Sequence, residues 1–199
     1  GYGSALVTSG ACSLIRRFQP ASEAQMPSIS SQMAKVNDMF KKMLYRGPSF
    51  EVLHEEYAKK GITDDRAPIH ASADTLISAP VERVWKLLIN LPGWPAITPS
   101  IRDVQLEAGT VVDARFSFRL NNFPIAAKIA VINPGRELHW TGASLWFKAV
   151  DLHLLEPARE GGTRLYIAES FAGLLATLFL STERLTAQHE VWLEAFKRA

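Results

Sequence analysis

The sequence predicts an α+β fold in which a curved, seven-stranded antiparallel sheet wraps a long C-terminal helix. Three observations support this prediction. Between residues 71 and 171, short runs of alternating apolar and polar residues are separated by turn signals, which is typical of antiparallel strands. A helical pattern interrupts these runs after the first strand. The chain then ends in one long segment with helical spacing, which can cover the apolar face of such a sheet.

The individual elements follow from turn and capping residues. Pro80 opens a helix after the first strand, and Pro92-Gly93 ends it. Asn121-Asn122 and Gly161-Gly162 mark turns between later strands. The last helix is expected near residues 174–198. The predicted strands cover residues 73–78, 104–106, 111–120, 125–132, 137–143, 147–155 and 163–171.

An N-terminal extension, residues 1–70, differs in composition from the main domain, residues 71–199, because all four methionines precede residue 70. Residues 32–45 have a Met and Phe stripe at helical spacing, and Ser49 can cap a second helix over about residues 50–60. We expect the stripe to dock on the main domain. A lid or a partner surface is the alternative, and homodimer formation is left open.

The first thirty residues are rich in turn-prone residues and are expected to be flexible to about residue 31. Arg16, Arg17 and several serines give a weak similarity to an organellar transit peptide, whereas an appended tail is the simpler interpretation. We therefore predict a cytoplasmic protein, with an organelle as the alternative if this stretch acts as a targeting peptide.

Composition and charge exclude several classes of function. Residues 71–199 hold 13 basic and 13 acidic side chains, so no basic field indicates nucleic-acid binding. The longest apolar run, Phe171 to Leu180, is half of what a membrane-spanning helix needs. A single cysteine, Cys12, excludes an intramolecular disulfide and a cysteine-built metal site. Metal-ligand spacings, a P-loop and a hydrolase elbow are absent from the sequence, and no metal or cofactor is predicted.

A family resemblance rests on six short segments in a fixed order over residues 71–199. They are Ile77-Ser-Ala-Pro-Val-Glu-Arg-Val-Trp85, Leu91-Pro-Gly-Trp-Pro95, Asn133-Pro-Gly-Arg-Glu-Leu-His-Trp140, Leu155-Glu-Pro157, Gly161-Gly-Thr-Arg164 and Glu169-Ser-Phe-Ala-Gly-Leu-Leu175. In this order the chain resembles the START-like, or SRPBCC, superfamily, which includes polyketide cyclases and dehydratases.

The resemblance implies a helix-grip fold, in which the sheet grips the last helix around a cavity for a hydrophobic molecule. Members of this superfamily bind lipids, polyketides or plant hormones, and some are cyclases, aromatases or lyases. They share no single catalytic motif, so the resemblance transfers no catalytic residue to this chain.

Polar residues on the last two predicted strands are the candidate catalytic group. If Leu155 pairs with Leu165 across the Gly161-Gly162 loop, Asp151 faces Glu169, and His153 is its diagonal neighbour. Two close carboxylates cannot both ionise easily, so one pKa should rise, and an acid of raised pKa beside an imidazole suits proton transfer. Anchoring of a ligand and purely structural hydrogen bonding are the alternatives.

Pattern and resemblance disagree about which face of residues 147–155 is buried. The alternate residues Val150, Leu152 and Leu154 form the more apolar face, whereas the resemblance turns the face of Asp151 and His153 toward the cavity. We follow the resemblance, because a polar cavity tolerates buried Asp and His better than a dry core does.

The apolar cavity wall is predicted from inward positions of separate elements. His189 lies on the inward stripe of the last helix, where a core role is the alternative, and Trp85 and Trp94 are expected to be packing anchors. Arg115 and Arg119 are expected in solvent, and His139 is expected to be exposed. The predicted ligand-binding residues are Phe116, Phe118, Ile129, Trp140, Ile167, Phe171, Leu178 and His189.

Two functions from different classes fit this sequence. The preferred one is a cofactor-free cyclase, dehydratase or isomerase acting on a polyketide- or terpenoid-like molecule, with Asp151, His153 and Glu169 moving protons. The second is a non-catalytic carrier or sensor of a lipid or other apolar metabolite, in which the same residues anchor a head group. A protein-interaction domain that docks a partner through the Met-rich helix is a weaker third.

Overall fold

A computed structural model describes residues 28–199 of the chain. The predicted flexible, transit-like stretch falls almost wholly on residues 1–27 and lies outside the described residues.

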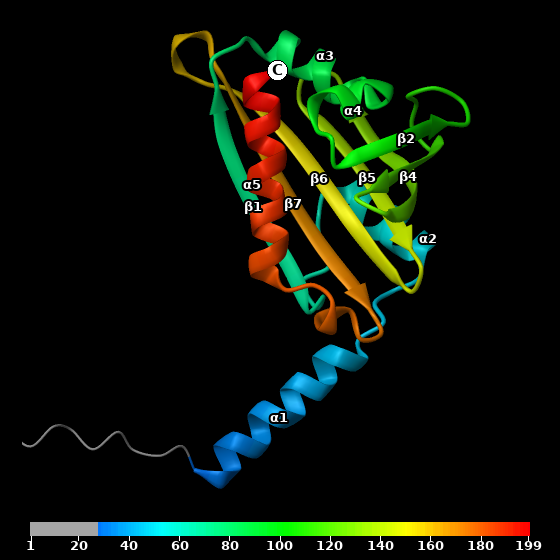
Figure 1. The fold of residues 1–199 in the computed structure, drawn as a ribbon, viewed down its shortest axis with the longest axis vertical. Helices are drawn as coiled ribbons and strands as arrows, with labels where there is room; N and C mark the ends of the chain where they lie inside the picture. Colours follow the sequence, from blue (N-terminus) through cyan, green and yellow to red (C-terminus); the bar gives the residue numbers. More distant parts are fainter. Residues whose placement is uncertain (1–27) are drawn as a thin grey trace, which may run out of the picture.

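The core of the molecule is one seven-stranded antiparallel sheet in the order β1-β7-β6-β5-β4-β3-β2 (Figure 1). Every neighbouring pair is antiparallel, so the predicted fold class is confirmed. The strands are β1 Ile69–Ile77, β2 Ile101–Leu106, β3 Arg115–Leu120, β4 Phe123–Asn133, β5 Glu137–Ser144, β6 Phe147–Pro157 and β7 Thr163–Gly173.

Helices cover the concave face of the sheet. The long helix α5, Thr182–Arg198, runs along β1 and β7, while α3, Val81–Ile89, and α4, Trp94–Ile97, close one end (Figure 1). The helix α5 begins about eight residues later than predicted. Leu175 adopts a left-handed conformation with φ of 62°, Ala176–Leu178 form a single 3-10 turn, and Ser181 caps α5 by accepting a hydrogen bond from the Arg184 amide.

The third predicted strand is also shorter than expected, because β3 begins at Arg115 rather than at residue 111. Asp113, with a left-handed φ of 66°, lies in the turn that precedes the strand and interrupts the extended chain there. Arg115 is exposed and Arg119 is half-buried, with its guanidinium donating to the Asn122 carbonyl at 2.7 Å.

The convex face carries a strap from the extension, defined here as residues 50–60. It comprises α2, Phe50–Val52, one π turn, η1, Leu53–Tyr57, and one 3-10 turn, η2, Ala58–Lys60. Leu53 packs in a buried cluster with Val150 and Leu152 of β6. Both faces of β6 are therefore covered. This explains why the more apolar face of the strand, which carries Val150 and Leu152, lies on the side away from the cavity.

Polar contacts also hold the strap on the sheet. The buried His54 places Nε2 2.9 Å from Asp113 Oδ1 and Nδ1 3.3 Å from the Thr141 hydroxyl. The ammonium groups of Lys59 and Lys128 each lie 3.0 Å from the same Asp113 oxygen. His54, Glu55 and Asp113 are close enough to share a metal ion, but these two lysines already supply the positive charge.

The prediction that His139 is exposed is wrong. Its side chain is buried beneath the strap, and Nδ1 lies 3.2 Å from the Ala58 carbonyl oxygen. The error has a tertiary cause, because the convex face would be open if the strap were absent.

The first helix, α1, Ile29–Leu44, projects from one end of the domain (Figure 1). None of its side chains is buried by the described residues 28–199, so the expectation that its Met and Phe stripe docks on the main domain is wrong. Its C-terminal end is attached by a 2.7 Å hydrogen bond from the Leu175 amide to the Met43 carbonyl. No helix within residues 28–199 is long and apolar enough to cross a membrane.

Candidate functional site

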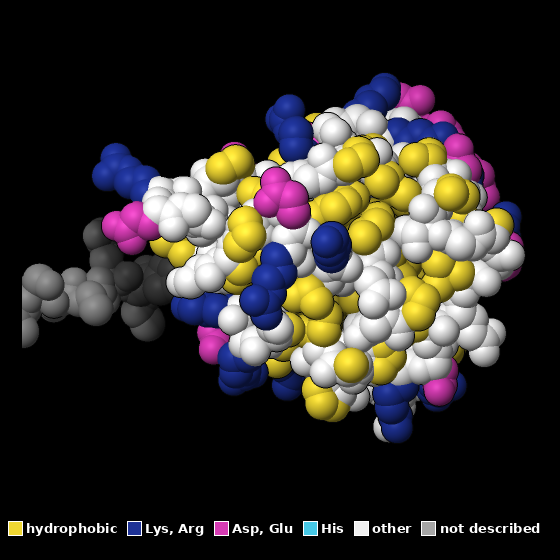
Figure 2. Space-filling view, turned by 90° about the horizontal axis from the view of Figure 1, so that it is seen from above, with side chains coloured by type: hydrophobic (Ala, Val, Ile, Leu, Met, Phe, Trp, Pro, Cys, Tyr) yellow, Lys and Arg dark blue, Asp and Glu magenta, His cyan; other side chains and the backbone are white. Residues whose placement is uncertain are grey.

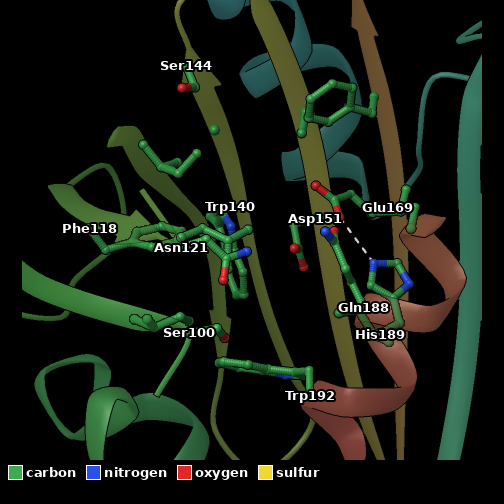
Figure 3. Close-up of a pocket in the computed structure, with 18 of the residues that line it drawn as sticks. Ser100, Phe118, Asn121, Trp140, Ser144, Asp151, Glu169, Gln188, His189 and Trp192 are labelled. Atoms are coloured by element: carbon green, nitrogen blue, oxygen red, sulfur yellow. Dashed lines mark hydrogen bonds and ion pairs between the residues drawn. The ribbon is translucent and has the colours of Figure 1, made fainter. Parts of the chain in front are cut away.

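A cavity of about 440 Å³ lies between the concave face of the sheet and α5 (Figure 3). Aromatic and aliphatic side chains form most of its wall, including Phe118, Trp140 and Ile167 of the sheet and Trp192 of α5. Trp94 closes the wall from α4, with its ring centroid 5.3 Å from that of Trp140. A largely apolar, concave wall of this size suits a small hydrophobic molecule.

Four polar side chains converge on one wall of this cavity. The cross-strand register pairs Asp151 of β6 with Glu169 of β7, as the Leu155–Leu165 alignment predicted. The imidazole of His189 reaches them from α5, with Nε2 3.1 Å from Glu169 Oε2 (Figure 3). His153, two residues after Asp151 on the same face, stacks on Trp140 with ring centroids 4.6 Å apart.

The polar partner of Glu169 differs from the prediction. Asp151 and His153 were expected to provide its hydrogen bond, but His189 does so because α5, which packs along β1, turns this side chain toward the neighbouring strand β7. Asp151 and His153 instead approach each other, with Oδ1 and Nδ1 2.8 Å apart. This ion-pair contact does not have hydrogen-bond geometry. The Glu169 side chain retains 16% of its exposure, so it is largely but not fully buried.

Burial and proximity perturb the pKa values of the Glu169–His189 pair. Burial raises the pKa of Glu169, the hydrogen bond from His189 opposes this shift, and the negative charge of Asp151 adds to it. Burial alone would lower the pKa of His189, but the hydrogen bond and charge of Glu169 outweigh it, so the pKa of His189 is raised. The pair therefore keeps a shared proton to higher pH than the separate side chains would.

Several polar atoms at the cavity are buried without a hydrogen-bond partner among residues 28–199. They are His153 Nε2, His189 Nδ1, Trp192 Nε1 and Ser144 Oγ. Buried polar atoms normally have partners, because an unpaired one costs about 1–3 kcal/mol. A ligand with one or two polar groups could satisfy these atoms, so they indicate which part of the wall would meet its polar end.

The predicted ligand-binding residues divide into three groups. Phe118, Trp140, Ile167, Phe171 and His189 line the cavity, together with the predicted catalytic residues Asp151, His153 and Glu169.

The second group, Phe116 and Ile129, is fully packed in the core and does not line the cavity. The Phe116 ring lies edge-on to Trp140, with centroids 6.2 Å apart, and so supports the wall from one side. Leu178 forms the third group and is 60% exposed, because it belongs to the surface turn before α5.

Sequence reasoning missed many residues that line the cavity, and Trp94, Trp192 and Ser144 are three instructive examples. Trp94 was expected to be a packing anchor, and it is one, since its indole N–H donates to the Leu88 carbonyl at 3.0 Å, but it also lines the cavity. Trp192 lies one helical turn after His189, a spacing that could have identified it. Ser144, at the end of β5, had no local signal in the sequence.

A curved antiparallel sheet that grips a C-terminal helix around an apolar cavity is the helix-grip fold of START-like proteins. The family model described as "Polyketide cyclase / dehydrase and lipid transport" matches residues 68–198. The chain therefore belongs to this family, and family and cavity together support binding of a hydrophobic ligand.

Solved structures share this fold at low sequence identity. A hypothetical protein from Helicobacter pylori has a TM-score of 0.61 at 18% identity, over 71% of this chain and 93% of that one. A START superfamily protein from Mycobacterium smegmatis has a TM-score of 0.56 at 12% identity, over 65% and 94%. DynU16, from the dynemicin biosynthetic locus, has a TM-score of 0.53 at 15% identity, over 65% and 46%. Comparison with curated proteins found no significant match.

Proposed function

We propose that the protein binds a polyketide- or terpenoid-like molecule and catalyses its cyclisation, dehydration or isomerisation without a cofactor. The observation that carries this proposal is the Glu169–His189 pair, 3.1 Å apart in an apolar cavity, with Asp151 and His153 beside it. A carboxyl group of raised pKa next to an imidazole can both accept and return a proton.

For a substrate that carries a ketone, these reactions share one step, the removal of a proton from the carbon next to the carbonyl group. The Glu169 carboxylate would take this proton, the electron pair of the broken C–H bond would form a carbon–carbon double bond, and the π pair of the carbonyl group would move onto its oxygen. An imidazole N–H of His153 or His189 could stabilise the negative oxygen. Return of the proton at another atom restores the carboxylate and completes an isomerisation.

Occupancy of the cavity is tested first, with the neutral fluorescent probe N-phenyl-1-naphthylamine. Gly142 lines the cavity, and a Cβ there would meet only Ile125 at an ordinary 3.5 Å. Gly142→Leu should weaken probe binding at least about tenfold by filling the cavity, whereas the matched control Gly142→Ala should bind as wild type does. Equal binding to both variants would show that the probe lies elsewhere.

Proton transfer is tested second, by following exchange of the α-protons of 2-tetralone in D2O by NMR. The wild-type protein should accelerate exchange, and Glu169→Gln should reduce this acceleration on the order of 100-fold. Glu156→Gln, which changes an exposed acid near the end of β6, is the matched control and should have no effect. Unchanged exchange in Glu169→Gln would remove Glu169 from the catalytic role.

A non-catalytic carrier is the second candidate. It is favoured by exposed apolar side chains, Leu145 and Trp146, directly before Phe147, which lines the cavity. Tight probe binding with no acceleration of exchange by the wild-type protein would favour the carrier.

A further inference from the structure

The helix α1 has an apolar face that residues 28–199 leave uncovered. Placed at 3.6 residues per turn, its large apolar side chains lie on one side, over an arc of about 140°. Ile29, Met33 and Phe40 retain 78%, 69% and 51% of their exposure. Such a face, on a helix of 16 residues, is the pattern of a helix that lies at an interface.

A second exposed apolar group lies at the same end of the domain. We call it the apolar rim; it consists of Leu145, Trp146, Leu178 and Phe179. The rings of Trp146 and Phe179 are 5.6 Å apart, which joins the β5–β6 turn to the segment before α5. That segment is also where α1 is attached, through the Leu175–Met43 backbone hydrogen bond.

The apolar rim continues into the cavity through a series of ring contacts. Trp146 lies 5.6 Å from Phe147, and Phe147 lies 4.7 Å from Phe171, between ring centroids. Phe147 and Phe171 both line the cavity. The apolar rim is therefore continuous with the wall of the cavity.

Charge distinguishes this end from the rest of the protein. Residues 28–46 hold four Lys and Arg but only one Asp, a net charge of +3, whereas residues 47–199 have a net charge of −2. Lys35, Lys41 and Lys42 lie outside the apolar arc of α1. At the opposite end of the domain, by contrast, charged side chains of both signs surround a central apolar area (Figure 2).

We propose that α1 and the apolar rim dock the protein on the surface of an anionic phospholipid bilayer, with α1 lying in the plane of the head groups. Apolar side chains would enter the acyl boundary, and the lysines would extend to the negative head groups. A second copy of the chain is a poorer occupant, because an identical helix has the same positive charge and offers the lysines no anionic partner. The proposal concerns a surface outside the cavity and stands independently of the proposed catalysis.

Co-sedimentation of the full chain with vesicles tests the proposal. Vesicles of phosphatidylcholine with one quarter phosphatidylglycerol should bind the protein at least about tenfold more tightly than pure phosphatidylcholine, and 0.5 M salt should abolish the difference. Phe40→Asp should reduce binding at least about tenfold. The matched control is Leu76→Asp, which changes an equally exposed apolar residue at the opposite end of the sheet and should bind as wild type does.

Contact between the apolar rim and the bilayer is measured separately, as quenching of tryptophan fluorescence by brominated lipid. This quenching should be smaller in Trp146→Phe than in wild type. Absence of wild-type binding to anionic vesicles, or unchanged binding of Phe40→Asp, would overturn the proposal. Equal binding to neutral vesicles would overturn the role of the lysines. A dimer in light scattering that Phe40→Asp converts to a monomer, without vesicle binding, would assign the face to a second copy instead.

Discussion

Replacing Leu53 with alanine tests whether the strap is an integral part of the folded domain. Leu53 is 2% exposed and packs against Val150 and Leu152 on the convex face. A buried Leu→Ala change removes apolar contacts and leaves a cavity, which costs about 2–5 kcal/mol. Because the strap is a single layer of short helical turns that can partly collapse into the space, we expect about 3 kcal/mol of lost unfolding free energy.

The assay is urea unfolding followed by circular dichroism, together with thermal unfolding. For a domain of this size, a loss of about 3 kcal/mol lowers Tm by roughly 6–12 °C. The neighbouring Val52, in the same strap, is 42% exposed, so Val52→Ala is the matched control and should change stability by less than about 0.5 kcal/mol.

Urea unfolding and thermal unfolding should each show one cooperative transition in both variants, because the strap and the sheet share one buried cluster. A loss below about 1 kcal/mol for Leu53→Ala would refute this reasoning, as would a separate early transition. Either result would mean that residues 1–70 behave as a separate appendage, as the division at residue 70 in the sequence suggested.

Three further predictions concern charged and hydrogen-bonded groups. Hydrogen bonds from His54 and from two lysines lower the pKa of Asp113. The stability that Asp113 contributes is therefore present at neutral pH and is lost as pH falls through its folded pKa. In urea unfolding, wild type should be about 1 kcal/mol more stable than Asp113→Asn at pH 7, and this difference should disappear in acid. The raised pKa of Glu169 has the opposite sign: the stability that Glu169 contributes is full below its ordinary pKa of about 4 and is lost as pH rises through the folded pKa. Glu169→Gln should therefore weaken the fall in stability above about pH 4. Burial and the 2.7 Å hydrogen bond from its hydroxyl to Asp64 raise the pKa of Tyr45 to about 12. Because Tyr45→Phe removes this hydrogen bond, it should cost about 1–2 kcal/mol in thermal unfolding, and it should leave vesicle binding unchanged.

The sequence predicted the sheet well because its signals are local. Alternation and turn residues located all seven strands, and the Gly161-Gly162 loop fixed the register that places Asp151 opposite Glu169. Register could be predicted here because a hairpin between two alternating strands allows few alignments without reversing a face.

The positions of His139, His189 and Leu178 show where such reasoning fails. His139 is buried because the strap arrives from a segment some 80 residues earlier, and no local pattern encodes that contact. The pairing of His189 with Glu169 depends on how α5 crosses β7. Leu178 shares the apolar periodicity of the last helix. However, the left-handed conformation of Leu175 prevents a continuous helix from forming before α5, and Leu178 lies in a surface turn.

The two faces of β6 suggest how the fold supports a polar group inside an apolar cavity. On the concave face, Asp151 and His153 are largely buried, which costs free energy, because their 2.8 Å contact lacks hydrogen-bond geometry. On the convex face, Val150 and Leu152 are buried by the strap, and each contributes about 1.5–3 kcal/mol. The strap thus stabilises the same strand that carries the unfavourable polar residues. A helix-grip domain with an open convex face would lack this contribution. We therefore expect substitutions that weaken the packing of the strap to affect the cavity through β6.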